Sequence, residues 1–361
     1  MWEDITDPLY LPLKRGGQVC PSLESPMISN EPDGKICVHL RNLWETKIII
    51  CGSMELKIIE MLRNKNKLDL FCKYTSSDYL YHMITRCYLE ITNVCNLNCV
   101  FCPKTTRTRH TMTMDEFDTL TTRLTGAVRF LYFHLMGEPF LHPLLPQFMQ
   151  TARSKGFIPV LTTNGTLLSQ RHDLLNSLPH KLQISLHSHE GNGKNNLQQY
   201  ISEVMTFAKE AAQRGCVVVL RLWNEGGHNS MNDSILDLIA SHRPKPWVAR
   251  YDGWKLAENL YIENDNMFEW PDLQHEASTG EEVFCYALRN QIGVLVDGTV
   301  VPCCLDHNGD MPLGNLYEQT LNDILSSPRS IALYQGFTGH TAVEPLCQRC
   351  GYAAVSKQFR K

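Results

Sequence analysis

The sequence predicts an α/β fold, namely an open or partial barrel built from six βα units. From residue 88 onward, short runs of β-branched and aromatic residues alternate with amphipathic helical runs, as in folds with a parallel sheet. The predicted strands cover residues 88–92, 129–135, 158–163, 182–186, 217–222 and 247–251. The predicted helices between them cover residues 114–125, 144–155, 167–177, 196–214 and 232–242. Six units fall short of the eight that close a complete barrel, so the partial form is favoured.

The barrel region, residues 86–254, is flanked by segments of different character. Residues 1–85 begin rich in Pro and Gly and continue with two strand-like runs, KICVHL and TKIIIC, and a helix-like run, MELKIIEMLRN. They predict a small α+β domain or a capping extension. Residues 255–284 are polar and weakly periodic, which predicts a linker or covering loop. In residues 285–361, the run QIGVLVDGTVVPCC predicts a β-hairpin that turns at Asp297-Gly298.

Composition and charge exclude several classes of protein. The formal charge is -4 and the charged fraction is 20%, so the chain offers no basic face for nucleic acid. The first residues lack a secretory signal, and no apolar run approaches the roughly 20 residues that span a bilayer. We therefore expect a cytoplasmic protein, whose thiols are kept reduced. Its fourteen cysteines then indicate metal ligation by thiolate rather than disulfides.

Three cysteines, Cys95, Cys99 and Cys102, follow the first predicted barrel strand with the spacing C-x3-C-x2-C. Thiols this close in one loop can converge on a single metal centre. Three ligands leave one iron of a [4Fe-4S] cluster without a protein donor, and an open position lets a metal bind a substrate group. The alternative is a zinc loop completed by His110 or another residue, although structural zinc sites usually show ligands in pairs.

This motif resembles that of the radical SAM superfamily in its spacing, its place after the first strand and the aromatic Phe101 before the third cysteine. The resemblance implies a partial TIM-like radical SAM barrel and a [4Fe-4S] cluster whose open iron binds S-adenosylmethionine. An electron from the cluster then cleaves this cofactor to a 5′-deoxyadenosyl radical, which abstracts a hydrogen atom from the substrate. The resemblance places Phe101 near the adenine. The alternative is an ordinary loop aromatic that fills the barrel mouth.

Polar groups also end the next four predicted strands, in the runs HLMGEP, TTNG, SLHS and RLWNEGG. In a barrel of βα units these ends meet at one face, where active sites are built. The resemblance implies that Gly137 and Glu138 meet the amino group of the methionine moiety, with Met136 in place of a first glycine. It also implies cofactor contacts at the later strand ends, by Thr163 and Asn164, by Ser185 with the ribose and by Arg221 with the carboxylate.

Several of these residues have a simpler interpretation. Glu138 could cap its loop, Asn164 and Gly165 could form only a turn, and Arg221 could make a surface salt bridge. His187 and His189 are candidate acid–base groups because histidine ordinarily titrates near neutrality, but loop histidines of this kind are more often only solvated.

A second set of cysteines lies near the C-terminal end, where Cys285 and Cys303 flank the predicted hairpin and Cys347 and Cys350 form a C-x2-C pair. Four thiolates can enclose one complete cluster. The pattern resembles the SPASM family in its shortened form, the twitch domain, which implies one auxiliary [4Fe-4S] cluster. Cys304 adjoins Cys303, and the glycine spacing favours Cys303 as the ligand. A zinc ribbon of the same four thiolates is the alternative.

A cluster ligated by four thiolates has no open iron, so it is suited to accepting or relaying an electron after hydrogen abstraction. The resemblance therefore implies net oxidation or rearrangement of the substrate and a reductant such as flavodoxin or ferredoxin. We expect a ribosomally made peptide or protein as substrate, with residues 1–85 binding its leader. The alternative substrate is a small polyol or amino-sugar that is dehydrogenated. A hypothesis of another class is a non-enzymatic, zinc-binding regulatory protein.

Overall fold

The computed structural model describes residues 84–193, 196–276 and 283–353, together with three strands nearer the N-terminus. The chain divides into two units, Met1–Tyr79 (unit 1) and Leu80–Lys361 (unit 2). In unit 1, an antiparallel sheet is formed, in this order, by β1 (Met27–Asn30), β2 (Ile36–Arg41) and β3 (Lys47–Gly52). The two predicted strand-like runs are therefore β2 and β3. The helix predicted from MELKIIEMLRN lies outside the described residues.

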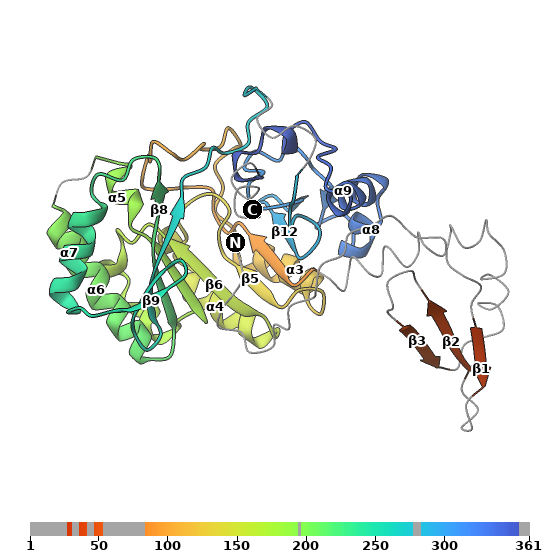
Figure 1. Ribbon diagram of the computed structural model, residues 1–361, viewed down its shortest axis with the longest axis horizontal. Coiled ribbons are helices and arrows are strands. Elements are labelled where there is room, and N and C mark those ends of the chain that lie inside the picture. Colours follow the sequence, from red (N-terminus) through yellow and green to blue (C-terminus); the bar gives the residue numbers. More distant parts are fainter. Residues whose placement is uncertain are drawn as a thin grey trace. The chain divides into compact units, whose positions relative to one another are not determined.

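The described part of unit 2 is organised around one sheet of eleven strands, in the order β14-β13-β12-β4-β5-β6-β7-β8-β11-β10-β9 (Figure 1). Its central strands, from β12 to β11, run parallel, and the order is linear, so the sheet stays open. Five central strands occupy five of the predicted positions: β4 (Arg86–Leu89), β5 (Phe130–Tyr132), β6 (Ile158–Thr163), β7 (Lys181–Ser185) and β8 (Val217–Glu225). The predicted open α/β barrel is confirmed.

Helices cover the outer side of this sheet, as Figure 1 shows for α4, α6 and α7. Four of them lie where amphipathic periodicity predicts them: α3 (Met114–Leu124), α4 (Leu145–Ser154), α6 (Leu197–Gln213) and α7 (Asn232–His242). The short α5 (His187–Glu190) follows β7. In the described ranges, no helix has the length and apolar character needed to cross a bilayer.

The helix predicted at 167–177 is instead two 3-10 turns, η2 (Leu168–Gln170) and η3 (His172–Asn176). The break falls at Arg171, whose backbone leaves the helical region with φ -120° and ψ 43°. Its guanidinium bonds the carbonyl of Phe140, at 2.6 Å, and the carboxylate of Asp173. The contact with Phe140 in a neighbouring loop cannot be predicted from sequence periodicity, and together with the local pair to Asp173 it favours the broken form.

The sixth parallel strand also differs from the prediction. Residues Val248–Arg250 form β9, but β9 lies at the antiparallel edge of the sheet, beside β10 (Gly253–Ala257). The place next to β8 is taken by β11 (Leu260–Asn266), within the segment predicted to be a linker or covering loop. Leu260 and Ile262 of β11 are buried, whereas Tyr261 and Glu263 alternate with them and are half-buried. Polar residues on one face of β11 therefore made this strand look like a loop.

The two faces of the parallel sheet have different chemistry. The face beneath the helices carries the aliphatic residues of the main core, for example Leu182, Ile184 and Leu220. The alternate residues of the same strands point the other way and form what we call the inner face. This face is mainly polar and aromatic, with Val160 and Val219 as aliphatic members, and it includes Tyr88, Tyr132, His134, Thr162, Gln183, Arg221 and Trp223. A packed barrel fills this space with layers of branched aliphatic side chains. The inner face is therefore suited to a ligand.

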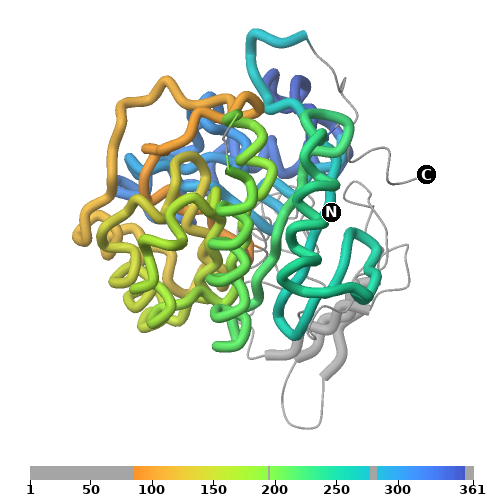
Figure 2. The backbone as a smooth tube through the Cα atoms, turned by 90° about the vertical axis from the view of Figure 1, so that its left-hand side faces the viewer, coloured from red at the N-terminus to blue at the C-terminus, as the bar shows by residue number. Residues whose placement is uncertain are grey.

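The C-terminal part of unit 2 continues the barrel sheet. The predicted hairpin is formed by β12 (Gln291–Val294) and β13 (Thr299–Val301), and β12 pairs in parallel with β4. Gly298 lies in the turn with φ +84°, which is a conformation that favours glycine. After the hairpin come β14 (Gly314–Asn315), α8 (Leu321–Leu325), α9 (Pro328–Thr338) and the 3-10 turn η4 (Cys347–Arg349). Figure 2 shows this blue segment beside the orange segment that contains β4.

Candidate functional site

The loop that carries Cys95, Cys99 and Cys102, here called the triplet loop, follows β4 at the carboxyl edge of the parallel sheet. Cys95 is exposed, and Cys99 and Cys102 are half-buried. The loop is fastened to the segment after β7, where Asn192 donates an amide hydrogen to Cys99 Sγ at 2.9 Å. The same Asn192 accepts a hydrogen bond from the backbone N–H of Asn98, at 2.7 Å.

Cys95 is held from the end of β6. The amide nitrogen of Asn164 lies 4.0 Å from Cys95 Sγ and 2.9 Å from Asn96 Oδ1, and the backbone N–H of Leu97 lies 3.4 Å from Cys95 Sγ. Burial raises the pKa of the Cys95 and Cys99 thiols above their ordinary values, whereas the Leu97 N–H and the Asn164 and Asn192 amides act in the opposite direction. Donors aimed at sulfur favour thiolate, the form that ligates iron, and they tune the potential of a bound cluster.

Phe101 lies against the loop after β7. Its ring is 5.0 Å from that of His187, and a Cβ at Gly191 would come within 2.6 Å of a Phe101 ring atom. Both predicted acid–base histidines are buried rather than solvated. The Nδ1 atom of His187 lies within hydrogen-bond distance of two backbone groups of β8, and burial lowers the pKa of His187 to about 4. The ring of His189 stacks on the ring of Tyr200, with 4.8 Å between the ring centres.

Glu138 accepts hydrogen bonds from the end of β6 and from the turn that follows it in sequence. Its Oε1 accepts from the backbone N–H of Phe140, at 2.9 Å, and from the hydroxyl of Thr163, at 2.7 Å. Its Oε2 accepts from the backbone N–H of Asn164 at 2.8 Å. Each carboxylate oxygen has about two acceptor positions, so Oε2 retains one for a further donor, such as an amino group. Glu138 also caps a 3-10 turn, η1 (Pro139–Leu141), as the simpler interpretation proposes.

Glu138 gives the iron-free protein a pH-dependent stability. Burial raises its pKa from 4.5 to about 6, against the three donors that favour the ionised form. Between these values the folded state holds the proton more tightly, so the free energy of unfolding falls as the pH rises, by about 2 kcal/mol in all. We expect urea unfolding under reducing conditions to show this fall between pH 4.5 and 7 in the parent protein relative to Glu138→Gln. A difference between the two proteins that does not change with pH would contradict it.

Gly137 brings the loop after β5 close to the loop after β4. Its φ is +77°, and a Cβ built at this position would lie 2.2 Å from the carbonyl oxygen of Thr92. The backbone N–H of Glu138 then donates to the carbonyl of Val94, at 2.9 Å. The glycine therefore sets how near Glu138 comes to the triplet loop.

Ser185, the last residue of β7, is the register partner of Arg221 in the middle of β8. Arg221 is buried, its guanidinium carbon lies 3.9 Å from the ring centre of Trp223, and its Nε lies 3.6 Å from Glu263 Oε2. The salt bridge considered from the sequence is thus present, although it is buried rather than at the surface. A cofactor contact of Arg221 stays a prediction.

The C-terminal thiols are brought together from three separate segments. The thiol of Cys303 is buried within electrostatic reach of Cys285, Cys347 and Cys350, and burial raises the pKa of each of the four. These four side chains pack against the main core. Cys304 also lies within electrostatic reach of Cys285 and Cys350, but it packs beside the tyrosines of the inner face. This arrangement favours Cys303 as the ligand.

Both thiol sets fit iron–sulfur clusters in their donor chemistry. One contains three thiols, of which Cys95 and Cys99 receive hydrogen bonds from N–H donors, and the other contains four buried thiols. Within residues 84–193, 196–276 and 283–353, no three His, Cys, Asp or Glu side chains are gathered tightly enough to hold one metal ion. A [4Fe-4S] cluster accepts a looser arrangement because each thiolate binds a different iron.

The sequence interpretation missed Asn192 and Glu263. Asn192 lies in the same run as the two histidines, SLHSHEGN, but nothing in its spacing distinguishes it from a solvated loop residue. Glu263 was missed because β11 was assigned to a loop. The alternation LYIENDN, with apolar residues at every second position at its start, was the available signal.

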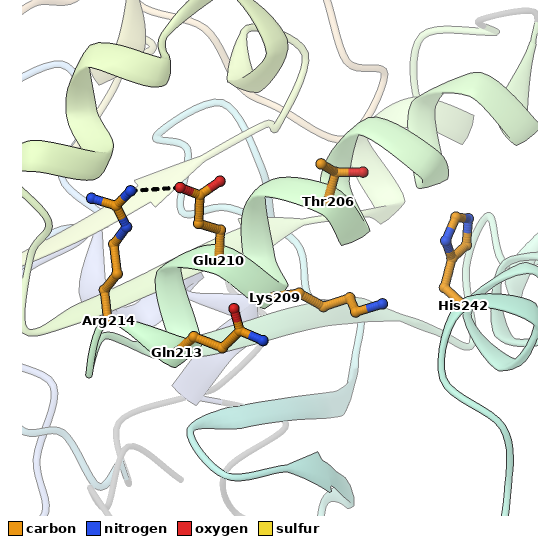
Figure 3. A pocket seen from close by; sticks show the side chains of 6 residues that line it. All are labelled: Thr206, Lys209, Glu210, Gln213, Arg214 and His242. Carbon is orange, nitrogen blue, oxygen red and sulfur yellow. Dashed lines mark hydrogen bonds and ion pairs between the residues drawn. The ribbon is translucent and has the colours of Figure 1, made fainter.

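A separate groove lies on the outer side of α6. It encloses about 520 Å³ and is lined by Thr206, Lys209, Glu210, Gln213, Arg214 and His242 (Figure 3). Within it, Glu210 and Arg214 form an ion pair at 2.6 Å. These residues come from helices on the outer side of the sheet, so the groove is not part of the candidate site.

Comparisons with known proteins agree with this geometry. Residues 89–239 match the radical SAM superfamily, and residues 285–351 match SPASM, an iron–sulfur cluster-binding domain. The tungsten-containing aldehyde ferredoxin oxidoreductase cofactor-modifying protein of Pyrococcus furiosus is 37% identical to this chain over 87 residues. These residues are 23% of this chain and 24% of that protein. The chain thus spans about a quarter of that relative's length.

Two further comparisons extend over most of the chain. The S-adenosyl-L-methionine-dependent 2-deoxy-scyllo-inosamine dehydrogenase of Niallia circulans is 24% identical over 291 residues, 78% of this chain and 97% of that protein. The crystal structure of Streptococcus suis SuiB bound to precursor peptide SuiA has the same fold, with a TM-score of 0.53, 15% identity and coverage of 88% of this chain and 82% of SuiB. Together, the two family matches and the two thiol sets show that this chain is an enzyme of the radical SAM superfamily with a SPASM domain, and that its cofactors are S-adenosylmethionine and iron–sulfur clusters.

Proposed function

We propose that this enzyme oxidises a ribosomally made peptide or protein, which residues 1–85 help to bind. The observation that carries the proposal is the antiparallel sheet of unit 1, which lies outside the two matched domains. Among the described strands, β1 and β3 each pair on one side only, so each offers an edge. An extended peptide can add to such an edge through main-chain hydrogen bonds.

The likeness to SuiB supports this proposal. Its crystal structure contains a precursor peptide, and the likeness covers 88% of this chain. That share exceeds what Leu80–Lys361 alone could supply, so it includes part of unit 1. The relative from Niallia circulans, in contrast, matches 78% of this chain, about the share that unit 2 represents.

In the proposed reaction, the bound cluster and S-adenosylmethionine supply a 5′-deoxyadenosyl radical that removes one hydrogen atom from the substrate. Cys95, Cys99 and Cys102 would hold the cluster, and Glu138 Oε2 would accept a hydrogen bond from the amino group of the methionine moiety. Phe101 would pack near the adenine. Radical SAM enzymes need an electron donor, for which we propose flavodoxin or ferredoxin.

Completing a two-electron oxidation requires the loss of one more electron and one proton. The four thiols Cys285, Cys303, Cys347 and Cys350 would hold one auxiliary cluster, which would supply an electron acceptor. His134 on the inner face is suited to accepting a hydrogen bond from a substrate O–H or N–H group. Thr162 donates its hydroxyl hydrogen to Gln183 Oε1 at 2.9 Å, so the 3.3 Å contact between Thr162 Oγ1 and His134 Nε2 places a proton on Nε2. His134 Nδ1 is then an acceptor, and it has no hydrogen-bond partner among the described residues.

Dehydrogenation of a small polyol or amino-sugar is the second candidate function. The observation that favours it is the match across 97% of the inosamine dehydrogenase. Hydroxyl groups would suit the uncharged hydrogen-bonding row formed by His134, Thr162 and Gln183, in which burial lowers the pKa of His134 to about 3 and keeps it neutral.

The full-length holoenzyme distinguishes the two candidates. It is incubated anaerobically with reductant, S-adenosylmethionine and either a precursor peptide encoded beside its gene or 2-deoxy-scyllo-inosamine. We expect the peptide to lose two hydrogen atoms in mass spectrometry and to cross-link to residues 1–85. Oxidation of the inosamine, with the peptide neither bound nor changed, would overturn the first proposal in favour of the second.

Cys347→Ala tests the division of labour between the two thiol sets. Removing one of four auxiliary ligands is expected to spare deoxyadenosine formation and to suppress substrate oxidation, because the triplet loop is unchanged. Deoxyadenosine and oxidised product are measured in the same reaction by liquid chromatography. If both fall equally while the chain stays folded, the auxiliary site is not confined to the later step.

A further inference from the structure

A fully buried carboxylate lies between the two thiol sets. Glu90 directly follows β4, and its side chain has no exposed surface. Its Oε1 accepts from Arg107 Nη2 at 2.7 Å and from the backbone N–H of Met136 at 3.2 Å. Its Oε2 accepts from Arg107 Nη1 at 2.8 Å and from the backbone N–H of Val296 at 3.0 Å. Donors from three segments of the chain therefore satisfy both oxygens.

Arg107 extends this link to the loop that carries Cys303. It lies five residues after Cys102, and its Nε donates to the carbonyl oxygen of His307, at 3.0 Å. The neighbouring residues repeat the connection, since the hydroxyl of Thr105 and the backbone N–H of Thr106 donate to Asn308 Oδ1 at 3.0 and 3.1 Å. Residues 105–107 are thus bonded directly to residues 307–308.

The space beside this link is filled by apolar side chains. One buried cluster consists of Leu135, Met136, Leu295 and Val301, and Cys102 and Cys304 both pack against it. Met136 belongs to this cluster through its side chain, and its backbone N–H is bonded to Glu90. The second backbone N–H that donates to Glu90 belongs to Val296, which directly follows Leu295 of the same cluster. The carboxylate therefore holds two of the segments that separate the triplet loop from the Cys303 loop.

We propose that Glu90 and Arg107 are positioning residues that fix the separation and orientation of the two cluster-bearing loops. A bidentate Arg–carboxylate pair constrains both partners in distance and angle, which a point charge such as Lys does not. The link touches neither thiol set directly, so it acts through the loops. It goes beyond the proposed function, because it concerns the geometry between the clusters and not the identity of the substrate.

The chain offers a matched control for an ordinary stabilising ion pair. Arg329 makes the same kind of bidentate contact with Glu344, at 2.7 and 3.0 Å, and also donates to the carbonyl of Pro312 at 3.0 Å. All three residues lie in the C-terminal part of unit 2, so this pair does not join the two cluster-bearing loops. Arg107→Ala and Arg329→Ala therefore remove similar chemistry with different connections.

The test compares the full-length holoenzymes of the parent, Arg107→Ala, Arg107→Lys and Arg329→Ala. Each is reduced with dithionite, and pulsed EPR measures how strongly the auxiliary cluster enhances the spin relaxation of the triplet-loop cluster, an effect that falls steeply with separation. Iron content and deoxyadenosine formation are measured in parallel. We expect Arg107→Ala to keep its iron and to form deoxyadenosine, but to lose much of the relaxation enhancement, with Arg107→Lys intermediate and Arg329→Ala unchanged.

Three results would overturn the proposal: an unchanged relaxation enhancement in Arg107→Ala, an equal change in Arg329→Ala, or loss of iron from both Arg107 variants, which would make the pair a general stabilising contact. The readout needs no substrate. A failure of the proposed peptide oxidation would therefore leave this result standing, and the reverse also holds.

Discussion

Cys99→Ala is expected to abolish the reductive cleavage of S-adenosylmethionine while leaving the fold intact. With two thiolates left, the cluster loses a ligand that the loop cannot replace, because the amide of Asn192 donates to Cys99 Sγ and cannot itself act as a thiolate. Anaerobic reconstitution followed by measurement of iron and deoxyadenosine checks this. We expect iron near that of the auxiliary cluster alone and no deoxyadenosine above background.

Cys216→Ala serves as the control for Cys99→Ala. Cys216 is buried in the main core and belongs to neither thiol set, and burial raises its pKa to about 12, so it is a neutral packing residue. This variant is expected to lose some stability and to keep cofactor cleavage. Cleavage that survives in Cys99→Ala, or that disappears equally in Cys216→Ala, would show that the triplet loop does not hold the catalytic cluster.

Gly137→Ala is expected to be strongly destabilising and to block cofactor binding. A side chain at the positive φ of Gly137 carries a strain of about 1–3 kcal/mol. The added Cβ would also overlap the carbonyl oxygen of Thr92, which is backbone and cannot rotate away. The loop after β5 must then move away from the triplet loop, and Glu138 moves with it. Urea unfolding of the reduced, iron-free protein gives the loss of stability.

Gly126→Ala separates the effect of backbone strain from the effect of the overlap with the Thr92 carbonyl. Gly126 has a φ of +80°, nearly that of Gly137, but no atom lies within 4 Å of the position its Cβ would take. The Gly126→Ala variant should therefore lose only the stability that the strained backbone costs, and it should keep binding S-adenosylmethionine. If the two variants lose equal stability, the close approach of the two loops does not limit what residue 137 can be.

The sequence predicts the barrel elements well where a single hydrophobic pattern runs through the segment. It predicts them poorly where contacts with distant residues determine the local structure. The strand 158–163 and the helix 232–242 were predicted with the bounds that the structure has, because their patterns are clear and their flanks are marked by turns. β11 was missed because its inner face is polar. The 3-10 break at Arg171 depends on the carbonyl of Phe140, which is distant in sequence.

The same distinction applies to the candidate site. The cysteines could be proposed from spacing alone, because thiol ligands cluster in sequence when they share a loop. Glu90 could not be proposed, since it stands inside a strand pattern and its partners lie at positions 107, 136 and 296. A carboxylate that is satisfied by remote backbone groups leaves no local signal. Such residues are found only when the fold is known.

The pairing of β12 with β4 has a consequence for how this chain folds. The first barrel strand acquires its outer neighbour only when a segment about 200 residues further along the chain reaches it. Contacts between such distant segments form slowly, and until then one edge of β4 is an unpaired strand edge, which is prone to associate with other chains. During synthesis the barrel would thus be exposed to aggregation until the SPASM domain emerges. Proteins truncated between residues 254 and 290 should be recovered mainly in the insoluble fraction.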